Sequence, residues 1–237
     1  MKIRLGIEAK NSQQRKELLK ELKKYDITPS KNPNIIISLG GDGTFLVAEK
    51  KHPGIPKLLI RDSEVCKKCT NSGLDKVVQR LKKDKFRVVT HHKIQGLVQK
   101  KKVLATNDVV IRNKLPTMAA RFQLFVNGKS IPPMIGDGVV ISTVFGSTGY
   151  YHSVSQSTFK KGWGVAFNNI TKKKKALLLK PKDLLEVRII RGPVTLSSDN
   201  HKKIFTLASG EKATFTLSSQ TAKVLDIDNI ANKLFKG

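Results

Sequence analysis

Hydrophobic and polar positions follow two different periods in the first part of the chain. Residues 3–7 alternate apolar and polar side chains, which predicts an opening strand, and the leucines of 18–22 recur at a helical spacing. Ile35–Ile37 is a short all-apolar run, typical of a strand buried on both faces of a parallel sheet. Residues 74–81 place apolar side chains at i, i+3, i+4 and i+7, as an amphipathic helix does. This alternation of strands and helices predicts a parallel α/β unit.

A different pattern begins near residue 87, where short β-like runs follow one another with turn residues between them. Asn127-Gly128 is typical of a two-residue hairpin turn, and long helical periodicity does not occur in this part. The β-like runs are Lys102–Ile111, Ala120–Val126, Gly138–Ser142, Leu184–Ile190, Ile204–Leu207 and Thr214–Leu217. They predict a separate, mostly antiparallel β domain.

The predicted fold class is therefore α/β plus all-β, in two domains. Residues 1–86 form the α/β domain and residues 87–221 the β domain. The apolar spacing of Val224–Phe235 favours a terminal helix. We expect the segment 222–237 to pack back on the first domain.

The net charge of the chain is large, but it excludes few classes of function. Lys and Arg number 45 against 18 Asp and Glu, so the net charge is +27 and the isoelectric point is near 10.2. A positive field attracts phosphorylated metabolites, nucleotides and nucleic acids alike. The run Lys172–Lys175 lies beside turn-like residues, and we interpret such runs as loop positions on a solvated surface. Nucleic-acid binding stays an alternative.

Location follows from what the chain lacks. No apolar run approaches the roughly 18 residues of a membrane span. The first residues alternate charged and apolar side chains, unlike a secretion signal. We expect a cytoplasmic protein without membrane contact.

Two cysteines, Cys66 and Cys69, form a C-x-x-C pair. A structural zinc site needs about four ligands, and the sequence has no second C-x-x-C or H-x3-5-H to supply them. We interpret the pair as two reduced thiols near a loop, with a disulfide or a half-site shared across a dimer as the alternatives.

The glycine-rich run Gly40-Gly41-Asp42-Gly43-Thr44 directly follows the first buried strand run. Loops at the carboxyl ends of parallel strands bind ligands, and glycines let bare backbone amides approach a phosphate. Thr44 is the expected cap of the following helix. Asp42 would repel a phosphate, so its presence indicates another task, either accepting a proton from a hydroxyl or helping to hold Mg²⁺. Both tasks belong to phosphoryl transfer. A plain glycine-rich turn is the alternative interpretation.

Two further segments carry polar side chains beside strands. Gly136–Thr143 is an apolar strand entered through an Asp-Gly turn, and Val144–Tyr150 continues it as a hydroxyl- and glycine-rich loop. Such a loop can surround a flat, polar ligand such as adenine. In Thr106–Val110, the adjacent Asn107 and Asp108 interrupt a β-like run and are able to hold ribose hydroxyls or a base edge. Taken alone, the first of these segments is equally well a strand followed by a polar loop, and the second is better interpreted as a turn or bulge.

These residues together resemble the NAD kinase family. GGDGT, Asn107-Asp108 and GDGVVIST followed by GST occur in the order and spacing of that family, over roughly residues 34–155. GGDGT alone is shared with diacylglycerol and sphingosine kinases, whereas the longer motif is specific to NAD kinases. The resemblance implies a Rossmann-like α/β domain, a C-terminal β-sandwich that binds NAD, an active site between them and a homodimer or homotetramer.

The resemblance also implies roles for individual residues. Asp42 matches the catalytic base and Gly43 its phosphate-side neighbour. Asn107 and Asp108 match a pair that contacts the dinucleotide, and Asp137 matches an aspartate that reaches NAD in the adjoining protomer. The adenosine-contacting run corresponds to Thr148, Gly149, Tyr150 and Ser153, and Ala166 is the candidate for the nicotinamide side.

The expected activity is transfer of a phosphoryl group to the 2′-hydroxyl of the adenosine ribose of NAD, giving NADP. ATP or polyphosphate would be the donor, with Mg²⁺ as the divalent ion and no dedicated set of protein metal ligands. A lipid kinase of the GGDGT group is the first alternative, but no convincing apolar membrane-facing segment occurs. A non-enzymatic nucleic-acid-binding protein is the second, and it leaves both motifs unexplained.

Overall fold

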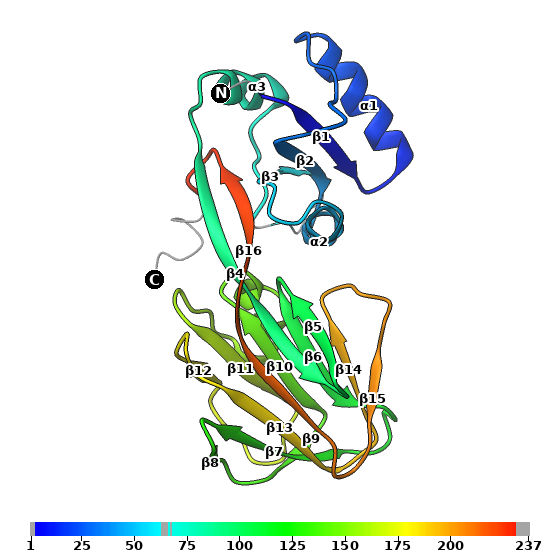
Figure 1. The fold of residues 1–237 in the computed structure, drawn as a ribbon, viewed down its shortest axis with the longest axis vertical. Coiled ribbons are helices and arrows are strands. Elements are labelled where there is room, and N and C mark those ends of the chain that lie inside the picture. Colours follow the sequence, from blue (N-terminus) through cyan, green and yellow to red (C-terminus); the bar gives the residue numbers. More distant parts are fainter. Residues whose placement is uncertain (1–2, 63–65, 67, 231–237) are drawn as a thin grey trace. The chain divides into compact units, whose positions relative to one another are not determined.

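The chain forms two compact units in the computed structural model, which describes residues 3–62, 66 and 68–230 (Figure 1). The first unit comprises the described parts of 1–90 and 222–237, and the second comprises 91–221. Two strands are shared by both units, β4 (Arg87–Val98) and β16 (Lys212–Asp226). The second unit is therefore inserted between two segments of the first.

The sheet of the first unit is parallel. Strand β1 (Leu5–Ala9) pairs with β2 (Ile35–Gly40), and β2 pairs with β3 (Lys57–Arg61). The end of β16 joins this sheet beside β3, with Val224 opposite Lys57. Residues 35–37 are all buried, as expected of a parallel strand covered on both faces.

Three helices cover this sheet: α1 (Ser12–Lys23), α2 (Asp42–Lys51) and α3 (Leu74–Lys82). The apolar sides of α1 and α3 share one core with the sheet, built around Leu18, Leu22, Ile35, Ile37, Val77, Val78, Leu81, Leu225 and Ile227. Ile36 points to the opposite face because side chains alternate along a strand, and α2 packs against β2. The predicted α/β unit is confirmed.

The second unit is a sandwich of two antiparallel sheets. One sheet contains β16, β13 (Leu185–Arg191), β7 (Ala120–Val126) and β8 (Lys129–Ser130) in that order. Strand β4 pairs with β16, β5 (Lys101–Ala105) pairs with β4, and β9 (Met134–Gly136) pairs with β7. The other has the order β12 (Leu177–Leu179), β11 (Trp163–Asn168), β10 (Gly138–Thr143), β6 (Asp108–Asn113), β14 (Val194–Ser198) and β15 (Phe205–Leu207).

A single hydrophobic core lies between these two sheets. It contains residues of both, among them Ile94, Phe122, Leu185 and Phe215 from one and Val109, Ile111, Ile141 and Trp163 from the other. Asn127 and Gly128 both have positive φ, 51° and 79°, and form the two-residue turn between β7 and β8. The β-sandwich and this hairpin are thus confirmed.

The structure differs from the sequence predictions at three places. Val224 to Asp226 continue strand β16 instead of starting a helix, and residues 231–237 lie outside the described part of the chain. The segment predicted as a loop after β10 is helical, with a 3₁₀ turn η1 (Gly146–Thr148) and the helix α4 (Tyr150–Ser155). Helix α2 begins at Asp42 with Gly41 as its cap, so Thr44 lies inside the helix and does not cap it.

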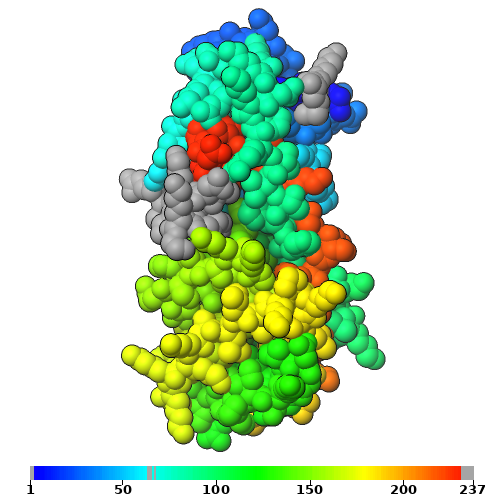
Figure 2. Space-filling view, turned by 90° about the vertical axis from the view of Figure 1, so that its left-hand side faces the viewer, coloured from blue at the N-terminus to red at the C-terminus, as the bar shows by residue number. Residues whose placement is uncertain are grey.

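The surface of the second unit includes the edges of both sheets. In Figure 2, the yellow segment around β12 and the green segment around β7 and β8 form adjoining parts of that surface. Leu178 in β12 is 61% exposed, which is usual for a short edge strand. None of the helices among the described residues has the length and apolar character that crossing a membrane requires.

Candidate functional site

The glycine-rich loop lies at the carboxyl end of β2, and its backbone leads directly into α2. Gly40 has a φ of +147°, and an added Cβ would collide with the side chain of Thr44, so only glycine fits here. An added Cβ on Gly43 would meet no described atom within 4 Å. The fold therefore requires Gly40, whereas Gly43 leaves open space beside the first turn of the helix.

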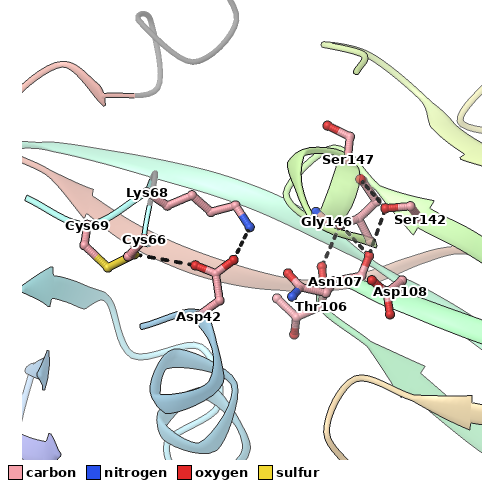
Figure 3. Close-up of polar contacts among 12 residues, drawn as sticks. Asp42, Cys66, Lys68, Cys69, Thr106, Asn107, Asp108, Ser142, Gly146 and Ser147 are labelled. Atoms are coloured by element: carbon pink, nitrogen blue, oxygen red, sulfur yellow. Dashed lines mark hydrogen bonds and ion pairs between the residues drawn. A yellow bond between two sulfur atoms is a disulfide. The ribbon is translucent and has the colours of Figure 1, made fainter. Parts of the chain in front are cut away.

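Asp42 is the first residue of α2, where the helix dipole favours a carboxylate. Its Oδ2 lies 2.7 Å from Nζ of Lys68, and the two side chains are 35% and 6% exposed (Figure 3). Lys68 is thus a nearly buried cation whose amine points at the candidate catalytic carboxylate. In the sequence, nothing but its place in C-x-x-C distinguishes Lys68 from the other lysines, so its role could not be predicted.

Cys66 and Cys69 form a disulfide, so the interpretation as reduced thiols is wrong. Their Cα atoms are 5.6 Å apart, within the usual range for a disulfide. Both sulfurs reach the glycine-rich loop: Sγ of Cys66 lies 3.6 Å from Oδ1 of Asp42, and Sγ of Cys69 lies 3.6 Å from the carbonyl oxygen of Gly40. Lys68, which lies between the two cysteines in the sequence, therefore reaches Asp42 beside a disulfide that contacts the same loop.

In the second unit, the turn that contains Asn107 is held by a buried carboxylate. Asp199 accepts hydrogen bonds from the backbone N–H groups of Thr106, Asn107 and Asp108, at 2.7, 2.8 and 3.2 Å. Burial raises the pKa of Asp199, and the three backbone donors act in the opposite direction. Asp199 lies 91 or more residues from these partners, so sequence spacing alone gave no sign of its role.

The same turn is held on its other side by the end of β10. The backbone N–H of Thr143 donates to the carbonyl of Asn107 at 2.9 Å, and the Thr143 hydroxyl donates to the carbonyl of Thr106 at 2.6 Å. Gly146 approaches so closely that an added Cβ would collide with the carbonyl oxygen of Asn107 (Figure 3). Asn107 and Asp108 therefore stand on a turn whose backbone is fixed from both sides.

One polar atom at this turn lacks a partner. The side-chain oxygen of Asn107 is buried, and no hydrogen-bond donor reaches it from the residues that the structure describes. Buried polar atoms are nearly always paired with protein or water. A ligand hydroxyl or amino group is thus a fitting partner for Asn107, as the sequence analysis expected of this residue type.

The candidate residues of 148–153 lie on η1 and α4. Tyr150 is 38% exposed, and its hydroxyl accepts a hydrogen bond from the Asn168 side chain at 3.2 Å. Ser153 donates back to the carbonyl of Gly149, at 3.1 Å from its backbone and 3.4 Å from its hydroxyl. Thr148 and Gly149 are half-buried where η1 meets α4.

Two candidates of the second unit stand apart from the Asn107 turn. Asp137 precedes β10, at the end opposite Thr143, and accepts a hydrogen bond from the Asn169 side chain at 3.1 Å. Ala166 is fully buried in a cluster with Val140, Tyr151 and Phe159. Ligand contact at Asp137 and at Ala166 stays a prediction.

The ten candidate residues divide between the two units. Asp42 and Gly43 belong to the first, and the other eight belong to the second. Within the described residues, no group of three His, Cys, Asp or Glu side chains is arranged to hold a metal ion. Asp42 supplies a carboxylate at the start of α2, directly after the glycine turn. That fits Mg²⁺ arriving with a polyphosphate, because Mg²⁺ is usually bound by one or two carboxylates together with phosphates and water.

These features define a class of two-unit proteins. A parallel α/β unit carries a glycine-rich loop with an aspartate, and a β-sandwich is inserted into the chain of that unit. No protein-family model matches the chain. A bifunctional NADP phosphatase/NAD kinase of Methanococcus maripaludis is 24% identical over 85% of this chain and 38% of its own length. An NAD kinase of Clostridium beijerinckii is 30% identical over 51% of this chain and 45% of its own length.

A solved structure, that of an Archaeoglobus fulgidus NAD kinase in complex with ATP, has the same fold, with a TM-score of 0.83 and 19% identity. The match covers 98% of this chain and 97% of that one. The chain spans less than half the length of the two curated relatives named above. The chain is thus similar in sequence to proteins named NAD kinase, and it shares the fold of a solved NAD kinase.

Proposed function

We propose that the protein is an NAD kinase, which transfers the terminal phosphoryl group of ATP to the 2′-hydroxyl of the adenosine ribose of NAD. The observation that carries the proposal is Asp42, which opens helix α2 directly behind a glycine turn at the carboxyl end of a parallel strand. Proteins named NAD kinase are its relatives, and one with the same fold has been solved with ATP. No described feature favours a lipid or a nucleic acid as the substrate.

In the proposed reaction, the ribose oxygen attacks the terminal phosphorus as the bond to the leaving diphosphate breaks. The proton of the hydroxyl passes to Asp42. Because such transition states are loose, positioning and charge neutralisation contribute more than strong base catalysis. Asp42 would orient the hydroxyl, and Asn107 and Asp108 would hold the dinucleotide on their fixed turn. Mg²⁺, when bound with the donor, neutralises phosphate charge.

The decisive experiment measures NADP formation by the purified protein, with ATP and polyphosphate as donors and with NAD and NADH as acceptors. Asp42→Asn should lower kcat by about 10²–10⁴-fold, the usual effect of losing a general base. The thermal unfolding midpoint should fall, because the nearly buried Lys68 ammonium loses its carboxylate partner, so kcat is compared at a temperature where circular dichroism shows both proteins folded. Near-normal turnover by this variant would refute the role of Asp42.

We also propose a homodimer or homotetramer in which Asp137 acts near a neighbouring protomer's site. Its support is the position of Asp137 at the end of β10 remote from Thr143 and from the Asn107 turn. Light scattering on the purified protein measures the assembly size. Asp137→Ala should raise KM for NAD several-fold in an oligomer, and a monomeric, fully active wild type would contradict the proposal.

A further inference from the structure

An aspartate in a phosphate-binding loop poses an electrostatic problem. Asp42 carries a negative charge where a polyphosphate of several negative charges has to approach. Two unit charges separated by a few ångströms at a protein surface repel each other strongly enough to change binding by an order of magnitude or more. The loop therefore needs a compensating positive charge if it is to hold the donor.

Lys68 supplies the positive charge that compensates Asp42. Its side chain is only 6% exposed, and its amine stands 2.7 Å from Asp42. A buried ammonium is costly unless it is paired, so this position is stable only with a carboxylate opposite. Lys51, elsewhere in the first unit, differs from Lys68 in burial. It pairs with Glu8, but its side chain is 56% exposed.

The backbone around Lys68 is also anchored. The Cys66–Cys69 disulfide closes the turn that contains it. The next residue, Thr70, exchanges backbone hydrogen bonds with β3, donating to Leu59 at 2.8 Å and accepting from Arg61 at 3.1 Å. Lys68 is therefore held at the loop by covalent and hydrogen-bonded neighbours on its own segment.

We propose that Lys68 is a positioning residue that neutralises Asp42 and so allows an anionic phosphoryl donor to bind beside a catalytic carboxylate. This inference rests on the proposed function and adds to it the residue that sets donor affinity. Lys68 acts through Asp42 and need not touch the phosphates. The pair is then neutral before the donor arrives, and the carboxylate is held in one orientation toward the acceptor hydroxyl.

A double-mutant cycle on donor binding tests the inference in the full-length protein. ATP with Mg²⁺ is titrated calorimetrically into wild type, Lys68→Met, Asp42→Asn and the double variant. Lys68→Met should weaken ATP binding about tenfold or more, because Asp42 is then uncompensated. Asp42→Asn, which leaves the Lys68 charge uncompensated, should bind ATP more tightly than wild type, and the double variant, in which the pair is again uncharged, should return to within about threefold of wild type. Lys68→Arg, which keeps the charge, should bind ATP nearly as wild type does.

Lys51→Met is the matched control, since it removes the same charge from the same unit at the other end of α2. If Lys68→Met binds ATP no more weakly than this control, the inference fails. It also fails if the double variant binds ATP as weakly as Lys68→Met does, since removing the Asp42 charge would then not relieve the loss. Should Lys68→Met not fold, Lys68→Gln makes the same comparison with an uncharged side chain able to hydrogen-bond Asp42.

Failure of the inference is distinguishable from failure of the proposed function. Tripolyphosphate serves as a second probe, because charge compensation concerns the phosphates and not the adenine. A wild type that binds ATP or tripolyphosphate and forms NADP, but whose double variant binds as weakly as Lys68→Met, contradicts only the role of Lys68. A wild type that forms no NADP with any donor contradicts the proposed function, and one that binds neither probe contradicts both.

Discussion

At the scale of single residues, the two units fix their candidate groups by different means. Asp42 forms a side-chain ion pair with Lys68, so electrostatic attraction fixes the orientation of its carboxylate. Asn107 and Asp108 are oriented through their backbone, by the Asp199 carboxylate on one side and Thr143 on the other. The side-chain oxygen of Asn107, which accepts no hydrogen bond from the described residues, is thereby held in a fixed position, which suits a residue expected to bind hydroxyl groups.

The two glycines of the loop should respond oppositely to alanine. Gly43→Ala should leave the free energy of unfolding unchanged or raise it by up to about 1 kcal/mol, because alanine is the better helix former and its methyl meets open space. If the donor phosphates approach there, kcat/KM should nevertheless fall about tenfold or more. Gly40→Ala, the control, should destabilise by about 1–3 kcal/mol, since its φ is positive and a methyl collides with Thr44.

Denaturant unfolding and NADP assays on both variants separate these effects. An active Gly43→Ala enzyme would show that the open space beside α2 is not used by the donor.

At the scale of elements, the residues explain which predictions succeeded. The run Ala120–Val126 coincides with β7, because alternating burial and a strong Asn-Gly turn signal agree there. Helix α4 has six residues and no amphipathic repeat in its sequence, and Tyr151 packs against Phe159 and Gly164, which lie outside the helix. Local pattern cannot supply such contacts.

The C-terminal segment shows how one pattern fits two structures. Leu225 and Ile227 are spaced by two, as in a strand, and Ile227 and Ile230 are spaced by three, as in a helix. Pairing with β3 decides for the strand up to Asp226. Neither the disulfide nor the Asp42–Lys68 ion pair could be predicted from the sequence. A C-x-x-C pair has the same sequence in its oxidised and reduced states.

The disulfide turn should contribute measurably to stability. Closing a loop of four residues restricts the unfolded chain enough to account for about 2 kcal/mol. The double variant Cys66→Ser/Cys69→Ser should therefore lower the free energy of unfolding of the first unit by roughly that amount. Dithiothreitol should lower the wild type to the level of the variant and leave the variant unchanged. Equal stability of the wild type with and without reductant would contradict the prediction.

At the scale of the whole molecule, the net charge of +27 causes the positive charges to repel one another over long distances. This repulsion is a sum over the whole chain and does not come from any one pair of residues. Screening weakens that repulsion, since the Debye length falls from about 30 Å at 0.01 M salt to about 3 Å at 1 M. We therefore expect the thermal midpoint to rise with NaCl between these limits, by about 2–4 °C for each kcal/mol of relieved repulsion.

Replacing exposed lysines of the loop before β12 supplies the control. The variant Lys172→Glu/Lys173→Glu lowers the positive charge without touching any candidate residue, so its midpoint should rise less with salt than that of the wild type. Calorimetry at several NaCl concentrations measures both proteins. A wild-type midpoint that falls or stays constant would show that the lysines are already neutralised by local partners.

The insertion of the sandwich also sets an order of events during synthesis. Leu225 and Ile227 belong to the core of the first unit, whose helices and other strands lie within residues 5–82. The ribosome has to add the 131 residues of 91–221 before that last strand exists, which takes about 7–26 s at 5–20 residues per second. The first unit is thus completed only after the second unit has been synthesised. Until residues 222–227 have been added, the edge of the parallel sheet beside β3 has no neighbouring strand.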